Sequence, residues 1–117
     1  MYSKAFQDHL TNPRNVGEIA DANAHAEEIN PVCGDRLALY LRIQNETIEA
    51  AQFLAYGCPP TLVCGSALTE MLIGRRIDQA SEIGREDLIA AIGGLPTRKQ
   101  HSAALAIEAL KSALRSA

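Results

Sequence analysis

Apolar and polar residues alternate through the middle of the chain. Positions 37, 39, 41 and 43 are all Leu or Ile, and the positions between them are Ala, Tyr and Arg. This period of two predicts a strand with one buried face. The polar triplet at 44–46 fits a hairpin turn, and the residues after it predict a second strand over 47–56. Because the step from Ala50 to Phe53 breaks the alternation, we expect a β-bulge there. A short strand is also expected over 25–29.

Helical spacing replaces this alternation at both ends of the chain. Apolar residues at 2, 6 and 10 lie four apart, which predicts a short amphipathic helix over 2–10 and a turn at 12–15. Beyond position 58, the spacing predicts a helix that starts at the proline pair 59–60 and ends at the glycine at 74. A shorter helix is expected over 87–92, where a Gly-Gly pair follows it.

The last helix is expected from about 98 to 115, because Thr97 and Gln100 have the spacing of a capping box. The strands therefore come first and most of the helices follow. This order is typical of the α+β class, in which a small antiparallel sheet packs against several helices.

Composition narrows the functions that such a fold can serve. A length of 117 residues fits a single domain over 1–117 with a sizeable core. Aromatic residues make up only 4% of the chain, which argues against a surface on which the bases of single-stranded nucleic acid stack. The net charge of −3 gives no excess of basic residues to attract a polyanion such as nucleic acid. No apolar run approaches the length of a membrane span, and the first residues do not resemble a signal peptide. We therefore expect a cytoplasmic protein with neither a nucleic-acid nor a membrane partner.

The three cysteines are the first sign of chemistry. An odd number in a chain without secretory features favours metal or thiol chemistry over a disulfide framework. Cys33 and Asp35 flank Gly34 in a loop before the strongest strand, and a glycine allows a positive φ that brings the backbone close to a bound ion. A thiolate and a carboxylate would give one soft and one hard ligand. A turn cysteine beside a turn aspartate remains the plain alternative.

Cys58 lies where the second long strand meets the helix. Backbone N–H groups at a helix N-terminus favour the thiolate, which is both a nucleophile and a metal ligand, although a small buried residue would also fit this junction. Cys64 falls on the apolar stripe of that helix, so we expect it in the core.

His101 is expected one turn inside the last helix, at the edge of its polar stripe, and a neutral imidazole there can bind metal. Ser102 follows it and faces the apolar side. The other two histidines, His9 and His25, have no matching partners and are expected at the surface.

Five short segments carry a resemblance to a known family. They are Asn12-Pro13-Arg14-Asn15-Val16-Gly17, Pro31-Val32-Cys33-Gly34-Asp35, Tyr56-Gly57-Cys58, Leu68-Thr69-Glu70 with Gly74, and Leu95-Pro96-Thr97-Arg98-Lys99-Gln100-His101. In this order and spacing, the chain resembles IscU and the N-terminal domain of NifU, which are scaffolds for iron–sulfur cluster assembly. The resemblance covers nearly the whole chain.

The resemblance implies an α+β fold with a three-stranded antiparallel sheet and several helices, as in the IscU/SufE-like sandwich. It implies a scaffold or carrier that is not itself an enzyme. Such a protein takes sulfur from a cysteine desulfurase, receives iron and passes a labile cluster, expected as [2Fe-2S], to apo-protein acceptors. Its matching site residues here are Cys33, Asp35, Cys58 and His101. The aspartate favours cluster lability, since a carboxylate is a poorer cluster ligand than a thiolate.

The chain departs from the family pattern in two places. The family has a third cysteine directly after the histidine, and this chain has Ser102, whose hydroxyl cannot carry a persulfide and is a poor cluster ligand. The stretch Leu-Pro-Pro-Val-Lys, which a specialised Hsp70 chaperone binds, differs at two of its five positions over 95–99. Docking of such a chaperone is therefore in doubt.

Two other function classes fit the same residues. Cys33, Asp35, Cys58 and His101 would make a tetrahedral donor set for one zinc ion, in a protein that regulates or docks on a desulfurase without building clusters. A thiol enzyme would use Cys58 with His101 as its base, but neither an oxyanion-hole motif nor a third orienting residue is evident.

Overall fold

The computed structural model describes residues 2–117, so the first residue of the expected 1–117 domain lies outside the described part. One antiparallel sheet has the order β1-β2-β3, and five α-helices and one 3₁₀ turn accompany it. The elements in chain order are α1 (Lys4–Thr11), β1 (Ala24–Ile29), β2 (Arg36–Gln44), β3 (Thr47–Tyr56), α2 (Pro59–Leu72), α3 (Ile77–Ala80), α4 (Arg85–Ala91), η1 (Thr97–Lys99) and α5 (His101–Ser116). The predicted α+β class is confirmed. Within residues 2–117, no helix is both long and apolar enough to cross a membrane.

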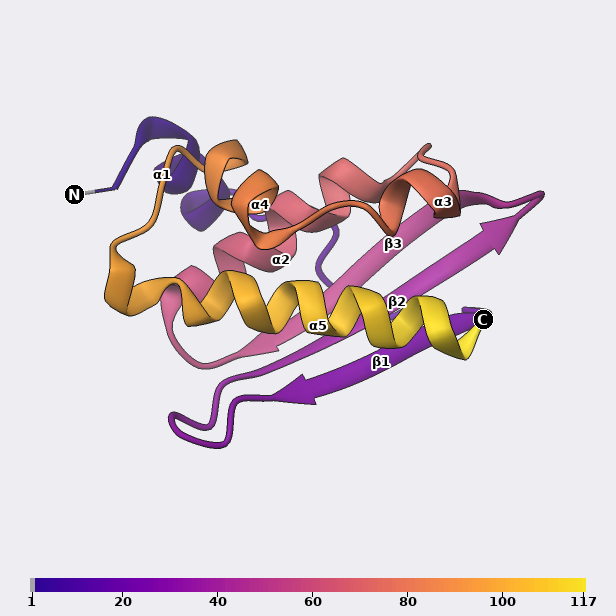
Figure 1. Cartoon of the computed structure of the whole chain (residues 1–117), viewed down its shortest axis with the longest axis horizontal. Coiled ribbons are helices and arrows are strands. Elements are labelled where there is room, and N and C mark those ends of the chain that lie inside the picture. Colours follow the sequence, from indigo (N-terminus) through magenta and orange to yellow (C-terminus); the bar gives the residue numbers. More distant parts are fainter. Residues whose placement is uncertain (1) are drawn as a thin grey trace.

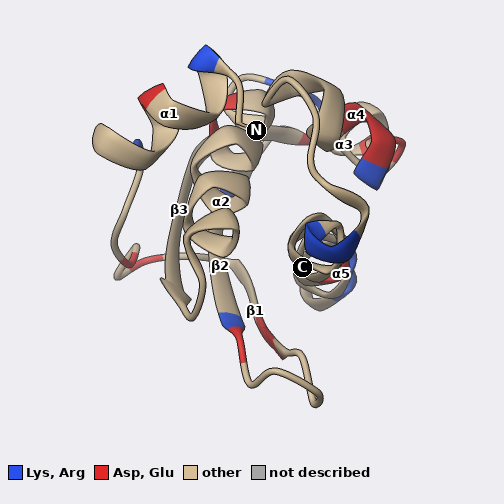
Figure 2. Cartoon of the chain, turned by 90° about the vertical axis from the view of Figure 1, so that its left-hand side faces the viewer, with Lys and Arg blue, Asp and Glu red and all other residues tan. Residues whose placement is uncertain are grey.

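Helices α2 and α5 cover the same face of the sheet (Figure 1). Viewed from the end of the molecule, α2 lies over β3 and α5 lies over β1 (Figure 2). The alternation of β2 causes this arrangement, since Leu37, Leu39 and Leu41 are fully buried on the helix-covered face. In the ladder Leu39 lies between Ala26 of β1 and Phe53 of β3, so the same face is apolar on all three strands.

The β-bulge occurs earlier than the sequence predicted. Arg42 pairs with Ala50 and Ile43 pairs with Ile48, which leaves Glu49 without a partner in the ladder. The extra residue turns Ile48 to the same buried face as Ala51, although the two are three residues apart. The broken alternation therefore lies between 48 and 51, and the prediction of a bulge between Ala50 and Phe53 was wrong.

The last helix begins later than predicted. Residues Thr97–Lys99 form a 3₁₀ turn, and α5 starts at His101, so the histidine is the first helical residue rather than one turn inside. No side-chain capping hydrogen bond is formed at either helix start, because the Gln100 side-chain amide donates instead to the carbonyl of Leu95. The capping-box prediction was therefore wrong.

His9 is buried, contrary to the surface position predicted for it. Its Nδ1 lies 2.7 Å from the Ser66 hydroxyl of α2, and its Nε2 lies 3.5 Å from a carboxylate oxygen of Glu70. The same hydroxyl accepts the backbone N–H of Arg14 at 2.9 Å. His9 thus joins α1 and the turn after it to α2, a contact between segments more than fifty residues apart.

This burial makes stability depend on the protonation of His9. Burial, with the nearby Arg14 guanidinium, lowers the pKa of His9 below the ordinary value for a histidine, which is about 6.5. Because the folded pKa is depressed, protonation favours the unfolded chain, and the stability contributed by neutral His9 is lost as pH falls below about 6.5. We expect the urea midpoint to fall between about pH 7.5 and pH 5.5, and to fall less in His9→Gln. His25→Gln, at an exposed position, is the matched control, and an equal fall in both variants would contradict the assignment.

Candidate metal site

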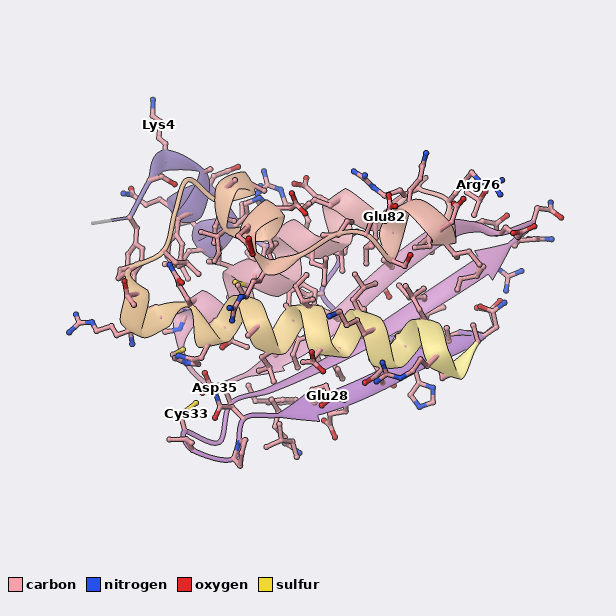
Figure 3. The ribbon with its side chains drawn as sticks, viewed as in Figure 1. Lys4, Glu28, Cys33, Asp35, Arg76 and Glu82 are labelled. Carbon is pink, nitrogen blue, oxygen red and sulfur yellow. The ribbon has the colours of Figure 1, made fainter. Side chains whose placement is uncertain are left out.

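Three segments that are distant in sequence meet at one end of the molecule. They are the loop between β1 and β2, the junction of β3 with α2, and the stretch from η1 into α5. Cys33 and Asp35 lie in the loop, below the first turns of α5 (Figure 3). The termini of the secondary-structure elements, rather than any one helix or strand, therefore build the site.

The loop is shaped by Asn30 and Gly34. The Asn30 side chain accepts the backbone N–H groups of Val32 and Cys33 at 2.9 and 3.4 Å, and the Asn30 N–H donates to the carbonyl of Asp35 at 2.8 Å. Gly34 has a φ of +79°, as expected from the sequence. This turn leaves Cys33 exposed at the tip while Asp35 is buried against the body of the protein.

Asp35 is held by donors from α2 and its N-cap. Its Oδ2 accepts the Cys58 thiol at 3.0 Å and the Thr61 hydroxyl at 2.9 Å. Burial acts to raise the pKa of Asp35, but hydrogen bonds from Cys58, Thr61 and Cys33 outweigh it and hold the pKa below its usual value. The group is therefore a carboxylate at neutral pH, the form that binds metal.

Gly57 leaves the space that the Asp35 carboxylate occupies. A Cβ at this position would lie 2.1 Å from Asp35 Oδ1, and the residue has a φ of +132°. Both the space and the backbone conformation therefore require glycine at the strand-to-helix junction.

His101 presents one ring nitrogen to the site. Its Nδ1 lies 3.2 Å from the carbonyl oxygen of Arg98, and because a carbonyl can only accept, Nδ1 carries the hydrogen. In the neutral ring the lone pair is then on Nε2, which lies 3.7 Å from Asp35 Oδ2. The side chain is one-third exposed, so an ion can reach this nitrogen. An imidazole oriented by a carbonyl in this way is a common metal ligand.

The four residues predicted for the site lie close together, but only three of them form one compact group of donors. Donor atoms of Cys33, Asp35 and His101 all lie within 4.8 Å of one another, and we call these three the outer trio. Cys58 is outside this group and contacts the trio through Asp35. The donors are one thiol, one carboxylate and one imidazole, with a second thiol behind them, and this set fits zinc or iron.

Thr61 is a site residue that the sequence analysis did not identify. Its hydroxyl is 3.6 Å from Cys58 Sγ and 3.3 Å from the Ser102 hydroxyl, and Ser102 is itself 3.7 Å from Cys58 Sγ. Thr61 and Ser102 are fully buried, as expected for Ser102. Cys58 is the N-cap of α2, so Thr61 is at N3, the position whose side chain faces the N-cap, and this spacing was the available signal.

The third cysteine lies away from the site. Cys64 is fully buried in the core, and burial raises the pKa of its thiol to about 12. The prediction of a core cysteine is confirmed. The hydrogen-bond partners of Cys58 within residues 2–117 are Asp35, Thr61 and Ser102, and none is the imidazole that the thiol-enzyme hypothesis requires as a base.

Known proteins are similar to this chain over nearly its whole length. Residues 1–116 match the family model described as the NifU-like N-terminal domain. The chain is 41% identical over 114 residues to a protein of Archaeoglobus fulgidus named iron-sulfur cluster assembly scaffold protein IscU 1, covering 97% of this chain and 74% of that one. It is 36% identical over 117 residues to the scaffold protein IscU of Escherichia coli K12, covering 97% and 91%.

A solved structure shares the fold. The crystal structure of a candidate scaffold protein for the SUF system from Fervidobacterium islandicum matches 97% of this chain and 96% of its own, with a TM-score of 0.80 at 20% identity. At that identity the structure supports the fold, and the sequence matches over nearly the whole chain define the class of protein. The chain belongs to the NifU-like N-terminal domain family.

Proposed function

We propose that this chain is an iron–sulfur cluster assembly scaffold or carrier and has no enzymatic activity of its own. The observation that carries the proposal is the outer trio, with Cys58 in contact with its carboxylate. Relatives named as scaffold proteins support the same function, since they match almost the whole chain. Sulfur would come from a cysteine desulfurase, and the cluster would pass to apo-protein acceptors.

The donor set supports a small and labile cluster as the cargo. A [2Fe-2S] cluster takes four protein ligands, and Cys33, Asp35, Cys58 and His101 supply four. Two of these four are not thiolates, so the cluster is held less firmly than in an all-cysteine site. Lability suits a protein that must give its cluster away. The cytoplasm remains the expected compartment.

A single zinc ion is the second candidate occupant. The outer trio offers three donors within reach of one ion, and Cys58 is the nearest thiol for the fourth position. A zinc-loaded form would suit a regulatory protein that docks on a desulfurase. This hypothesis uses the same residues but predicts a colourless protein.

Reconstitution distinguishes the two functions. The chain, incubated without air with ferrous iron, cysteine and a desulfurase, is expected to develop the visible absorbance of a cluster. A Cys33→Ala, Cys58→Ala double variant should lose that absorbance, and Cys64→Ala is the matched control because its thiol lies in the core. Absence of colour in the wild type, with about one zinc per chain in protein as purified, would replace the scaffold function by the zinc function.

A further inference from the structure

Cys33 is the most exposed donor of the outer trio. Asp35 is buried and accepts two side-chain hydrogen bonds from α2 and its N-cap, and a backbone carbonyl orients the His101 ring. Cys33 lies instead in a loop that projects beyond the ends of the strands (Figure 3). The preceding residue, Val32, is 93% exposed, so the hydrophobic core does not hold this part of the loop. The position of the Cys33 thiol therefore depends on hydrogen bonds within the loop.

Asn30 is the partner in those hydrogen bonds. Its backbone carbonyl accepts the Gly34 N–H at 2.8 Å, and its own N–H donates to the Asp35 carbonyl at 2.8 Å. These two backbone bonds close the base of the loop and do not depend on the side chain at position 30. The side-chain oxygen of Asn30 holds the tip, because it accepts the backbone N–H groups of Val32 at 2.9 Å and Cys33 at 3.4 Å.

The Asn30 side chain can therefore be changed without opening the base of the loop. An Asn side chain that accepts N–H groups from the residues just after it favours one conformation of the turn. Without that acceptor, the N–H groups of Val32 and Cys33 turn to water and the tip samples more conformations. An ion that binds must then order the tip, and its affinity falls because binding includes that cost.

We propose that Asn30 is a positioning residue that holds the Cys33 thiol within reach of the carboxylate and the imidazole of the outer trio before an ion binds. Asn30 is not a ligand, and it acts through the backbone of Cys33. The inference rests on the proposed function only for the identity of the cargo, since the hydrogen bonds and the donor distances belong to the chain itself.

Titration with Co²⁺ tests the proposal, because the near-ultraviolet absorbance of a bound Co²⁺ ion reports its thiolate ligands. Asn30→Ala is expected to bind Co²⁺ about tenfold more weakly than the wild type, the low end of the loss for residues that support metal ligands. At saturation its absorbance per bound ion should equal that of the wild type, because the ligands are the same. Asn30→Asp keeps the acceptor oxygen and should bind at least as tightly as the wild type, which a purely structural role would not require.

Asn30→Gln keeps the amide but moves its oxygen one carbon farther out, so it should also bind more weakly. This variant keeps the test valid if Asn30→Ala does not fold. Asn23→Ala is the matched control, because Asn23 makes two side-chain hydrogen bonds with the Ile43 backbone, at 2.6 and 2.7 Å, at the opposite end of β1. Its loss should leave the affinity for Co²⁺ unchanged.

Four results would each overturn the proposal. They are wild-type affinity in Asn30→Ala or Asn30→Gln, equal weakening in Asn23→Ala, binding by Asn30→Asp as weak as that of Asn30→Ala, and a wild type that binds no Co²⁺. Failure of the proposed function is a separate result. A chain with the expected dependence on Asn30 that still forms no coloured cluster in the desulfurase assay would refute the scaffold function and leave the role of Asn30 intact.

Discussion

Gly57→Ala is expected to lower the free energy of unfolding by about 2–4 kcal/mol, a large share of the stability of a small domain. Two costs add at this position. The new Cβ would lie 2.1 Å from Asp35 Oδ1, so the loop or the junction must shift. The φ of +132° also disfavours any L side chain, at about 1–2 kcal/mol. Chemical denaturation measures the sum, and the same shift should abolish binding of Co²⁺.

Gly34→Ala is the matched control for the steric part. Gly34 also has a positive φ, +79°, but a Cβ there would meet nothing within 4 Å. It should therefore show only the backbone cost of about 1–2 kcal/mol. If the two substitutions destabilise the protein equally, the Asp35 side chain can move away from a Cβ at position 57 without a cost in folding free energy, and the steric argument is wrong.

Ser102→Cys is expected to raise the cluster yield of the desulfurase assay and to slow cluster loss. The Ser102 hydroxyl lies 3.7 Å from Cys58 Sγ, so a thiol there would lie beside the existing one. A thiol ionises near neutral pH far more readily than a hydroxyl, and it can also carry a persulfide. Exchanging oxygen for sulfur adds little volume, although Ser102 is fully buried and some local adjustment is expected.

Visible absorbance per chain, measured without air for the wild type, Ser102→Cys and Cys64→Ser, decides the outcome. A gain from the first variant and no loss from the second is expected. If the wild type already equals Ser102→Cys, and Cys64→Ser abolishes the cluster, then the core cysteine is the third ligand after all. That result would require α2 to open, since Cys64 is fully buried in this structure.

The sheet was predictable because its signal is local. The leucines of β2 repeat at every second position, and their partners follow once the hairpin turn is placed. The four-residue helix α3 was missed because it is shorter than two helical periods. The start of α5 was misplaced because a second local hydrogen bond, from the Gln100 side chain to the carbonyl of Leu95 five residues earlier, competes with the capping pattern.

The sequence pointed to the four candidate ligands but not to the hydrogen-bond network that joins them. The sequence alone identifies residues whose types bind metal, which here are Cys33, Asp35, Cys58 and His101. Thr61 has no such chemistry, and its role appears only when the loop places Asp35 beside the first turn of α2. His9 was assigned to the surface for the same reason, since its partner Ser66 is 57 positions away.

The site residues are spread along the chain, so they are synthesised at different times. The loop at 33–35 and the junction at 57–58 leave the ribosome early, whereas His101 and Ser102 belong to the last helix. Ser102 lies beside Cys58 across a separation of 44 positions, so this contact cannot form before α5 has been synthesised. A nascent chain that ends before α5 has two thiols near Asp35 but no imidazole to complete the outer trio. The outer trio is therefore complete only after α5 has been synthesised and has packed against the sheet.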